Sequence, residues 1–253
     1  MTRARDRYDI FLSGGSQHVP LLRDLLPKLQ PHGRVHLASS FLTEGEQEEL
    51  RPWYDHLHHP RHHPDGYVNF NLFCIRDVNR LARAPYFIKL DADVGLRDDW
   101  IDYVDEAVLR HPGAVLFGTE RGDSPIDLAL TGAGVRERLG REVRVTGGWK
   151  VRGVLHVGRT EFFQRHDAFM QGVHELLYGP APNLAGAGEP RVVRSGNHRK
   201  LRDIGDEDTL RSLVVHALGA PKLVLDAGGR IAGSEWPRAL SDAGALPLRN
   251  GFL

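Results

Sequence analysis

Roughly the first hundred residues alternate between short apolar runs and amphipathic segments, and this alternation restricts the folds that the chain can adopt. Tyr8 to Leu12 and Arg34 to Phe41 predict strands, and leucines recur at helical spacing between them, from about His18 to Leu29. Tyr86 to Leu90 predicts a further strand. Strand, helix and strand at this spacing predict an α/β fold, with a mostly parallel sheet flanked by helices in a single domain.

The second half of the chain is less regular. The other elements that the pattern predicts are helices at 44–54, 75–84, 159–169 and 206–219, and strands at 114–120, 143–145, 151–157 and 222–226, the last of which is expected to be the final strand. Residues 67–73 are a candidate strand or the entry from a strand into a helix. Residues 179–200 are rich in glycine, proline and alanine and hold few large apolar groups. We therefore expect a long mobile loop there, of the kind that often serves as a lid or a binding segment.

Composition excludes several classes of function. The chain has 253 residues, enough for one substantial core, and its 33 basic and 33 acidic residues leave no net field for nucleic acid or an anionic membrane. A single cysteine, Cys74, excludes an internal disulfide and a CxxC metal site. Because no apolar signal segment or membrane span is apparent, we expect a cytoplasmic protein with no membrane insertion and no nucleic-acid partner.

Two aspartates directly follow the predicted strand that ends at Leu90. Asp91 and Asp93 are spaced so that both side chains point the same way if the strand geometry persists past Leu90. Two such carboxylates suit a hard divalent cation, which in turn binds phosphate oxygens. Asp98 and Asp99 stand where the next helix needs its cap, which leaves the earlier pair without a structural task. The pattern therefore favours a metal or phosphate role for Asp91 and Asp93.

Polar residues also follow the other predicted strands. Ser13 to Ser16 and Ser39-Ser40 each come after a strand, as Asp91 to Asp93 do. Ligands of a parallel sheet bind beyond the carboxyl ends of its strands, so these segments predict one shared site. The Ser13 to Ser16 loop has neither GxGxxG spacing nor a GK[ST] ending, which excludes a dinucleotide fingerprint and a P-loop. Its backbone amides can still bind a phosphate.

Three further features carry more than one interpretation. Asp206-Glu207-Asp208 opens the last predicted helix, where acidic residues usually cap amide groups, although a carboxylate there can also act as a general base. The run from His56 to His63 is rich in histidine, which suggests a transition metal, but its two prolines favour a solvated loop. Trp149 follows two glycines, which favour an exposed turn where its ring can stack on a sugar.

Three segments together resemble a known family. They are residues 79–101, with the DxD motif and the tryptophan of the following helix; 153–169, a strand before an arginine-containing helix; and 205–225, an acidic motif, a helix, a glycine and a strand. In content and order they resemble the glycosyltransferases of the GT-A fold, family 2 type, with their DxD and ED motifs. The resemblance implies a GT-A-like fold in which residues 1–110 bind a nucleotide sugar. Residues 111–253 would bind the acceptor and carry catalysis, with a mobile loop near 179–203.

The resemblance also implies roles for particular residues. The donor would be a nucleotide-diphosphate sugar, with Mn²⁺ or Mg²⁺ bridging its diphosphate to the protein. Asp93 matches the position that contacts the metal directly, and Asp91 matches the one that contacts the ribose or the metal. Asp208 matches the catalytic base and Glu207 an acceptor-binding position, while Arg76 falls near a position that faces the diphosphate. A single base that deprotonates the acceptor for in-line attack would invert the anomeric carbon.

The chain departs from this family at the nucleotide end. The family's first strand usually ends in a Pro-x-Asn-like turn and its second in an aspartate; Ser13 to Ser16 and Ser39-Ser40 stand at these places here. Because these positions hold the nucleobase and the ribose in the family, Ser13, Gly14 and Ser39 are candidate donor-binding residues. Asp65 is a candidate to replace the missing carboxylate.

The leading hypothesis is a metal-dependent inverting glycosyltransferase that acts on a small-molecule acceptor, with Trp149 and Glu207 in the acceptor site. A phosphohydrolase of the haloacid dehalogenase kind also carries a DxD motif after a strand. Here, however, the motif lies far from the amino terminus, and Gly95 stands where a threonine or valine is expected. The third hypothesis is a non-catalytic protein that binds a sugar nucleotide, and only the capping interpretation of Asp206 to Asp208 favours it.

Overall fold

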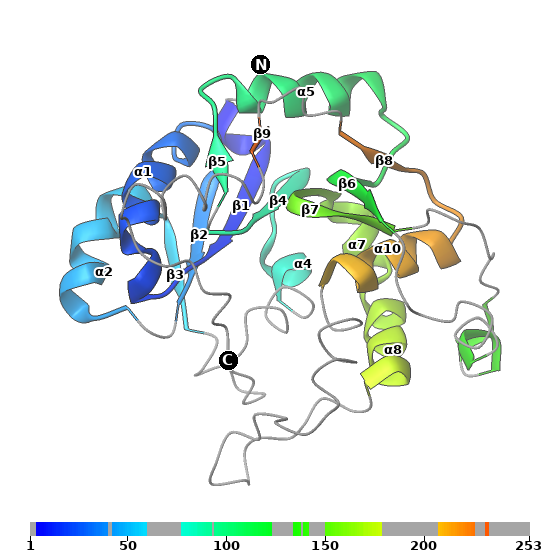
Figure 1. Ribbon diagram of the computed structural model, residues 1–253. Helices are drawn as coiled ribbons and strands as arrows, with labels where there is room; N and C mark the ends of the chain where they lie inside the picture. Colours follow the sequence, from blue (N-terminus) through cyan, green and yellow to red (C-terminus); the bar gives the residue numbers. More distant parts are fainter. Residues whose placement is uncertain are drawn as a thin grey trace, which may run out of the picture.

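The centre of the molecule is a seven-stranded sheet with helices on both of its faces (Figure 1). The computed structural model describes residues 4–39, 42–59, 77–92, 94–122, 134–137, 139–141, 150–178, 207–225 and 231–232. At 4, 17, 120–122, 152–154, 174–178, 207, 209 and 231–232 it describes the backbone alone. The strand predicted at 143–145, the candidate strand at 67–73 and the loop at 179–200 lie outside the described residues.

The strand order in the large sheet is β3-β2-β1-β4-β7-β6-β8. The strands are β1 (Tyr8–Ser13), β2 (Arg34–Ala38), β3 (His56–His58), β4 (Tyr86–Leu90), β6 (Leu116–Gly122), β7 (Lys150–Arg159) and β8 (Lys222–Val224). Strand β7 runs antiparallel to both of its neighbours, and every other pair in the sheet is parallel. A second, two-stranded sheet joins β5 (Gly95–Leu96) to β9 (Ile231–Ala232). The predicted class, a mostly parallel α/β sheet in one domain, is confirmed.

Helices divide between the two faces of the sheet. The described α-helices are α1 (Val19–Leu29), α2 (Glu44–Leu50), α4 (Val78–Leu81), α5 (Trp100–Arg110), α7 (Thr160–Arg165), α8 (Asp167–Tyr178) and α10 (Glu207–Ala217), with short 3-10 helices at Ala4–Asp6, Ser16–His18 and Arg51–Trp53. One buried cluster joins α1 and α5 to the sheet, and a second joins α4, α7, α8 and α10 to it. None of the described helices is long and apolar enough to cross a bilayer.

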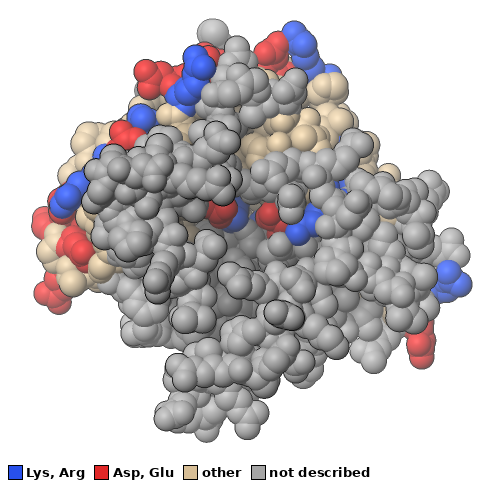
Figure 2. Space-filling view, viewed as in Figure 1, with Lys and Arg blue, Asp and Glu red and all other residues tan. Residues whose placement is uncertain are grey.

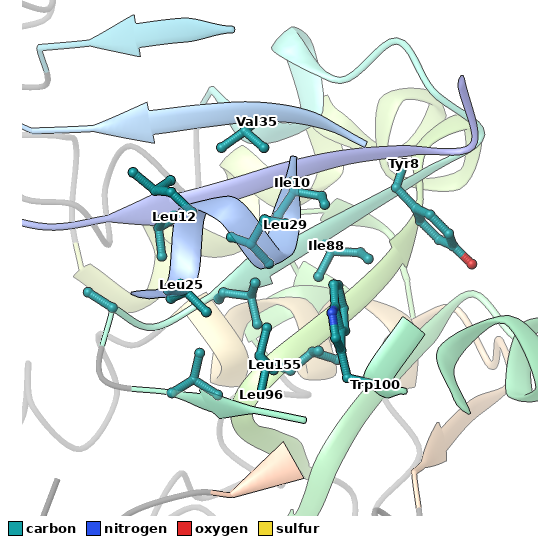
Figure 3. Packing of buried hydrophobic residues seen from close by; sticks show 14 of the residues in the cluster. Tyr8, Ile10, Leu12, Leu25, Leu29, Val35, Ile88, Leu96, Trp100 and Leu155 are labelled. Carbon is teal, nitrogen blue, oxygen red and sulfur yellow. The ribbon is translucent and has the colours of Figure 1, made fainter. Parts of the chain in front are cut away.

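The face under α1 and α5 is predominantly apolar. Ile10, Ile88 and Leu155 come from three strands and turn toward this side, where Trp100 and Leu29 of the covering helices meet them (Figure 3). All five side chains are buried. Alternation along each strand then sends the intervening residues to the opposite face. That opposite face is the one with polar groups.

On β4 the alternation separates two kinds of residue. Ile88 and Leu90 belong to the apolar cluster under α1, whereas Phe87 belongs to the cluster on the α10 side. Lys89 therefore faces the α10 side as well, although it is only 4% exposed. Burial of a lysine in a central strand costs free energy unless its ammonium group has a polar partner, so we expect such a partner on this face.

The structure corrects several predictions in the first half of the chain. The helix predicted at 75–84 ends at Leu81, because Ala82, with φ of −60° and ψ of 132°, leaves the helical region. Residues His56–His58 form β3 and pair in parallel with β2, so this part of the histidine-rich run lies in the sheet and not in a solvated loop. The helix predicted at 44–54 is α-helical only to Leu50 and ends as a 3-10 helix at Arg51–Trp53. Pro52 explains the change, because it has no amide hydrogen with which to continue the α-helix.

Two further corrections concern the second half. The helix predicted at 159–169 is two helices, α7 and α8, separated at His166, whose φ of −108° and ψ of 15° leave the helical region. Apolar spacing cannot reveal such a break when the residues on both sides favour helix. Strand β8 is also not the final strand, because β9 follows it and pairs with β5.

Candidate functional site

The carboxyl end of β4 carries an ion pair between a buried lysine and a partly exposed aspartate. The Nζ atom of Lys89 lies 2.6 Å from Oδ1 of Asp91, and the side chain of Asp91 is 40% exposed while that of Lys89 is 5% exposed. The strand ends at Leu90 and Ala92 lies in a turn, so extended geometry does not continue past Leu90. Asp93 lies outside the described residues, and its predicted orientation beside Asp91 stays a prediction.

The reasoning that left Asp91 without a structural task was wrong on two points. Asp99 occupies the N-cap position of α5, but its side chain makes no cap hydrogen bond; its Oδ1 lies 3.7 Å from Nε of Arg97. Asp91 does have a structural partner, Lys89. The ion pair holds one oxygen of the Asp91 carboxylate, and the exposure of this side chain leaves it able to meet a ligand.

A second polar pair lies on the neighbouring strand. His156 of β7 is fully buried, and in the sheet it stands directly opposite Lys89 of β4 and Gly118 of β6. Its Nδ1 atom lies 3.1 Å from Oδ1 of Asp208, in the first turn of α10, whose side chain is 13% exposed. The distance is that of an ion pair, but the angles are not those of an aligned hydrogen bond.

These two pairs bring Asp91 and Asp208 to one edge of the sheet, although they are far apart in the sequence. Directly paired residues of an antiparallel ladder point to the same face, so Lys89 and His156 stand side by side. Each then reaches a carboxylate. In the space-filling view acidic and basic groups come to the surface near the middle of the face shown (Figure 2).

Helix α10 is anchored so that its first turn faces this edge. The amide of Val151 on β7 donates to Oγ of Ser212 at 2.9 Å, and that hydroxyl donates to the Val151 carbonyl at 2.8 Å. Arg211 is fully buried on the same helix, with its Cζ atom 5.0 Å from the centre of the Phe87 ring. The helix therefore adds a second buried cation to the face that already carries Lys89.

Two of the serines predicted for the nucleotide end lie where expected. Ser13 is the last residue of β1 and Ser39 follows β2; both are buried, and the register pairs Leu12 with Leu90, so that Ser13 and Asp91 come at the same level. The prediction of phosphate-binding amides in the loop is wrong for two residues. The Gly14 amide donates to the Ala38 carbonyl at 3.2 Å, and the Gly15 amide to Nδ1 of His18 at 3.2 Å.

A chain of imidazoles lies next to these serines on the same face. The ring of His36 stacks on Phe11 with centroids 4.3 Å apart, and its Nδ1 lies 3.0 Å from Nε2 of His58. Its Nε2 lies 3.4 Å from Oδ1 of Asp9. Burial, followed by the neighbouring imidazole of His36, lowers the pKa of His58 to about 4. Among the described residues, no three or more His, Cys, Asp or Glu side chains are arranged to hold a metal ion.

Several predicted site residues cannot be placed. Asp65, Arg76, Asp93 and Trp149 lie outside the described residues, and Glu207 is described by its backbone alone. Sequence reasoning in turn missed Lys89 and His156. A signal for both was present, because each is a polar residue directly between two large apolar residues of a strand, a position that a protein rarely fills without a partner.

No family model matches the chain, and no curated protein matches its sequence. Among solved structures, it is similar to mouse xyloside xylosyltransferase 1 in its apo form, at 12% identity over 87% of this chain and 85% of that one, with a TM-score of 0.46. It is also similar to mannosyltransferase PcManGT from Pyrobaculum calidifontis in complex with GDP-Man and Mn²⁺, at 14% identity over 97% and 81%, with a TM-score of 0.42.

A third similar structure is S. aureus TarS 1–349, at 10% identity with a TM-score of 0.40; the chain matches it over 64% of its own length and spans 49% of that chain, about half of it. At these identities and TM-scores none of the three likenesses carries an argument about the activity of this chain. The case for a function rests on the geometry of the site itself.

Proposed function

We propose that the chain is a metal-dependent, inverting glycosyltransferase of the GT-A type, which moves a sugar from a nucleotide-diphosphate donor to a hydroxyl of a small-molecule acceptor. One observation supports this most strongly. Asp91 and Asp208, the two described carboxylates that the DxD and acidic motifs single out, are held by directly opposed residues of β4 and β7. Such a transfer needs a carboxylate that binds the donor and a base that deprotonates the acceptor, on either side of the anomeric carbon. The positions of Asp91 and Asp208 support these two roles.

The donor site lies in the amino-terminal half, residues 1–110. The Asp91 side chain is 40% exposed at the end of β4, and its carboxylate would accept a hydrogen bond from a ribose hydroxyl of the donor. Ser13 lies beside Asp91 on the next strand and Ser39 lies one strand further, in line with the nucleoside. Asp65 and Arg76 complete the proposed donor site.

The described part of the site offers a ligand of the kind that a divalent cation prefers. Asp91 offers a partly exposed carboxylate oxygen at the sheet edge, and hard oxygen ligands of this kind are what Mn²⁺ and Mg²⁺ prefer. Asp93 would be the direct ligand, with Asp91 beside it. When bound, the cation would neutralise charge that grows on the leaving diphosphate.

The base lies in the carboxyl-terminal half, residues 111–253. Asp208 would accept the proton of the acceptor hydroxyl while that oxygen attacks the anomeric carbon and the bond to the diphosphate breaks. Its carboxylate is mostly buried but not closed off, which suits contact with a bound acceptor. Glu207 and Trp149 would bind the acceptor.

Turnover of sugar nucleotides tests this function. The protein is incubated with a panel of UDP- and GDP-sugars, with Mn²⁺ or with a chelator, and release of the nucleoside diphosphate is measured. We expect slow release from at least one donor with Mn²⁺ and none with the chelator. Asp208→Asn should lower kcat by roughly 10²–10⁴-fold, the usual contribution of a general base, while donor affinity is kept.

A matched control separates loss of the base from loss of any helix-terminal carboxylate. Asp167 also opens a helix, α8, and its Oδ2 atom accepts from Arg80 at 3.0 Å. Asp167→Asn should therefore leave kcat close to wild type. Equal rates for Asp208→Asn and the wild-type protein would refute the assignment of the base, and turnover without metal would refute the metal dependence.

A further inference from the structure

His156 occupies a position whose chemistry the proposed reaction has not yet used. It is fully buried in the middle of β7, flanked on the chain by Leu155 and Val157, which turn to the opposite, apolar face. A polar ring in a central strand costs free energy unless it meets a polar partner. The partner that its Nδ1 approaches is Oδ1 of Asp208, at 3.1 Å.

Charged groups lie around this pair on the neighbouring elements. Strand β4 contributes Lys89 directly opposite His156, where its ammonium group pairs with Asp91, and α10 contributes the buried Arg211 one turn after Asp208. Strand β6 contributes Gly118, which carries no charge, and Asp167 of α8 pairs with Arg80 instead. A neutral imidazole with its proton on Nδ1 would donate a hydrogen bond to the carboxylate that this nitrogen faces.

We propose that His156 is the positioning residue of Asp208: its Nδ1–H holds Oδ1, keeps the carboxylate ionised and turns Oδ2 toward the acceptor. The inference rests on the proposed function. In the reaction the acceptor O–H bond breaks and its proton passes to Oδ2, as the oxygen bonds to the anomeric carbon and the diphosphate leaves. The proton later returns to solvent. The contact is not aligned in this state, as is common before substrate binds, and it tightens when the acceptor arrives.

Three variants test the proposal through the pH dependence of kcat/KM. His156→Leu removes the donor, so the acidic limb of the profile should move up by about one pH unit or more, with kcat lowered and the donor KM unchanged. His156→Asn places an amide N–H near the position of Nδ1 and should return the limb to within a few tenths of a unit of wild type. A purely structural histidine would show the opposite: an unmoved limb in His156→Leu, or no rescue by asparagine.

His36→Leu is the matched control. His36 lies in the same row of the sheet, is 5% exposed and also approaches a carboxylate, that of Asp9. We expect it to lower the melting temperature by about as much as His156→Leu and to leave the acidic limb in place. A shift of the limb in His36→Leu equal to that in His156→Leu would overturn the proposal, because it would make the effect a general consequence of lost stability.

Nuclear magnetic resonance on the wild-type protein gives a readout that does not need turnover. With ¹⁵N-histidine and ¹³C-aspartate labels, the ring of His156 should show the neutral Nδ1–H form at pH 7, and the Asp208 carboxyl should titrate at lower pH in wild type than in His156→Asn or His156→Leu. An Nε2–H form, or an Asp208 titration that no variant moves, would overturn the positioning role. If this coupling is present but no sugar nucleotide is turned over, the proposed function fails and the positioning role stands.

Discussion

Lys89 and His156 stand directly opposite each other on β4 and β7, and each contacts a different carboxylate at the same edge of the sheet. Both side chains are almost fully buried, whereas Asp91 and Asp208 are partly exposed. The sheet thus carries two buried polar side chains, and each of them contacts one of the two carboxylates. This arrangement fixes the separation of the two carboxylates more firmly than loops would, since both supports belong to paired strands.

Lys89→Met tests the role of the cation under Asp91. Methionine keeps the length of the side chain and removes its charge, which contributes on the order of 1–3 kcal/mol at a few ångströms in an environment of intermediate dielectric. The Mn²⁺ concentration that half-saturates donor binding should therefore fall about tenfold or more, as measured by calorimetry. Lys28→Met is the control, because Lys28 pairs with Asp24 on the surface of α1 and should change nothing. Unchanged or weaker Mn²⁺ affinity in Lys89→Met would contradict a metal beside Asp91.

The low pKa of His58 predicts how stability varies with pH. Burial and the neighbouring His36 lower this pKa to about 4, whereas an unfolded histidine titrates near 6.5. Between these values the unfolded state binds a proton that the folded state does not, so stability declines as the pH falls from about 6.5 to about 4. The decline amounts to roughly 3 kcal/mol at 1.36 kcal/mol per pKa unit.

Urea unfolding across this pH range measures the effect. His58→Gln should flatten the decline, and the same change at the exposed His111 should leave it as in wild type. A decline that persists in full in His58→Gln would place its origin elsewhere in the protein.

Gly158→Ala tests the packing that supports β7. Gly158 stands opposite Phe87 on β4, and a Cβ atom at this position would overlap the Phe87 ring. Overpacking of this kind typically costs about 1–3 kcal/mol. Gly113→Ala has open space around the new Cβ and should cost little. Adding Phe87→Leu to Gly158→Ala should recover part of the loss; equal stability of the two single variants would mean that the ring moves aside freely.

The sequence predicts well those elements whose local signals agree. Strand β4 has its predicted bounds, Tyr86 to Leu90, because the apolar run is bounded by Pro85 and Asp91. Helix α10 ends beside Gly219, whose φ of +66° is the left-handed conformation that glycine adopts without strain at a helix end. In such places the residue propensities, the apolar pattern and the residues that end the element all predict the same structure.

Strand β3 shows why other elements were missed. It consists of only three residues, two of them histidines, so no periodic apolar pattern marks it. What holds it in the sheet is non-local: the His58 ring stacks on His36 of β2, with centroids 5.3 Å apart. The pairing of Lys89 with His156 is non-local in the same way. A single sequence shows that each is a polar residue between two large apolar neighbours, but not that the two strands pair.

Binding of nucleoside diphosphates with and without Mn²⁺ tests the central claim most directly, because it asks whether the β4 edge anchors a donor through a metal. Calorimetry on wild type, Asp93→Ala and Asp208→Asn should show Mn²⁺-dependent binding of UDP or GDP in wild type and Asp208→Asn, and its loss in Asp93→Ala. Binding that does not depend on Mn²⁺, or that survives unchanged in Asp93→Ala, would contradict the account.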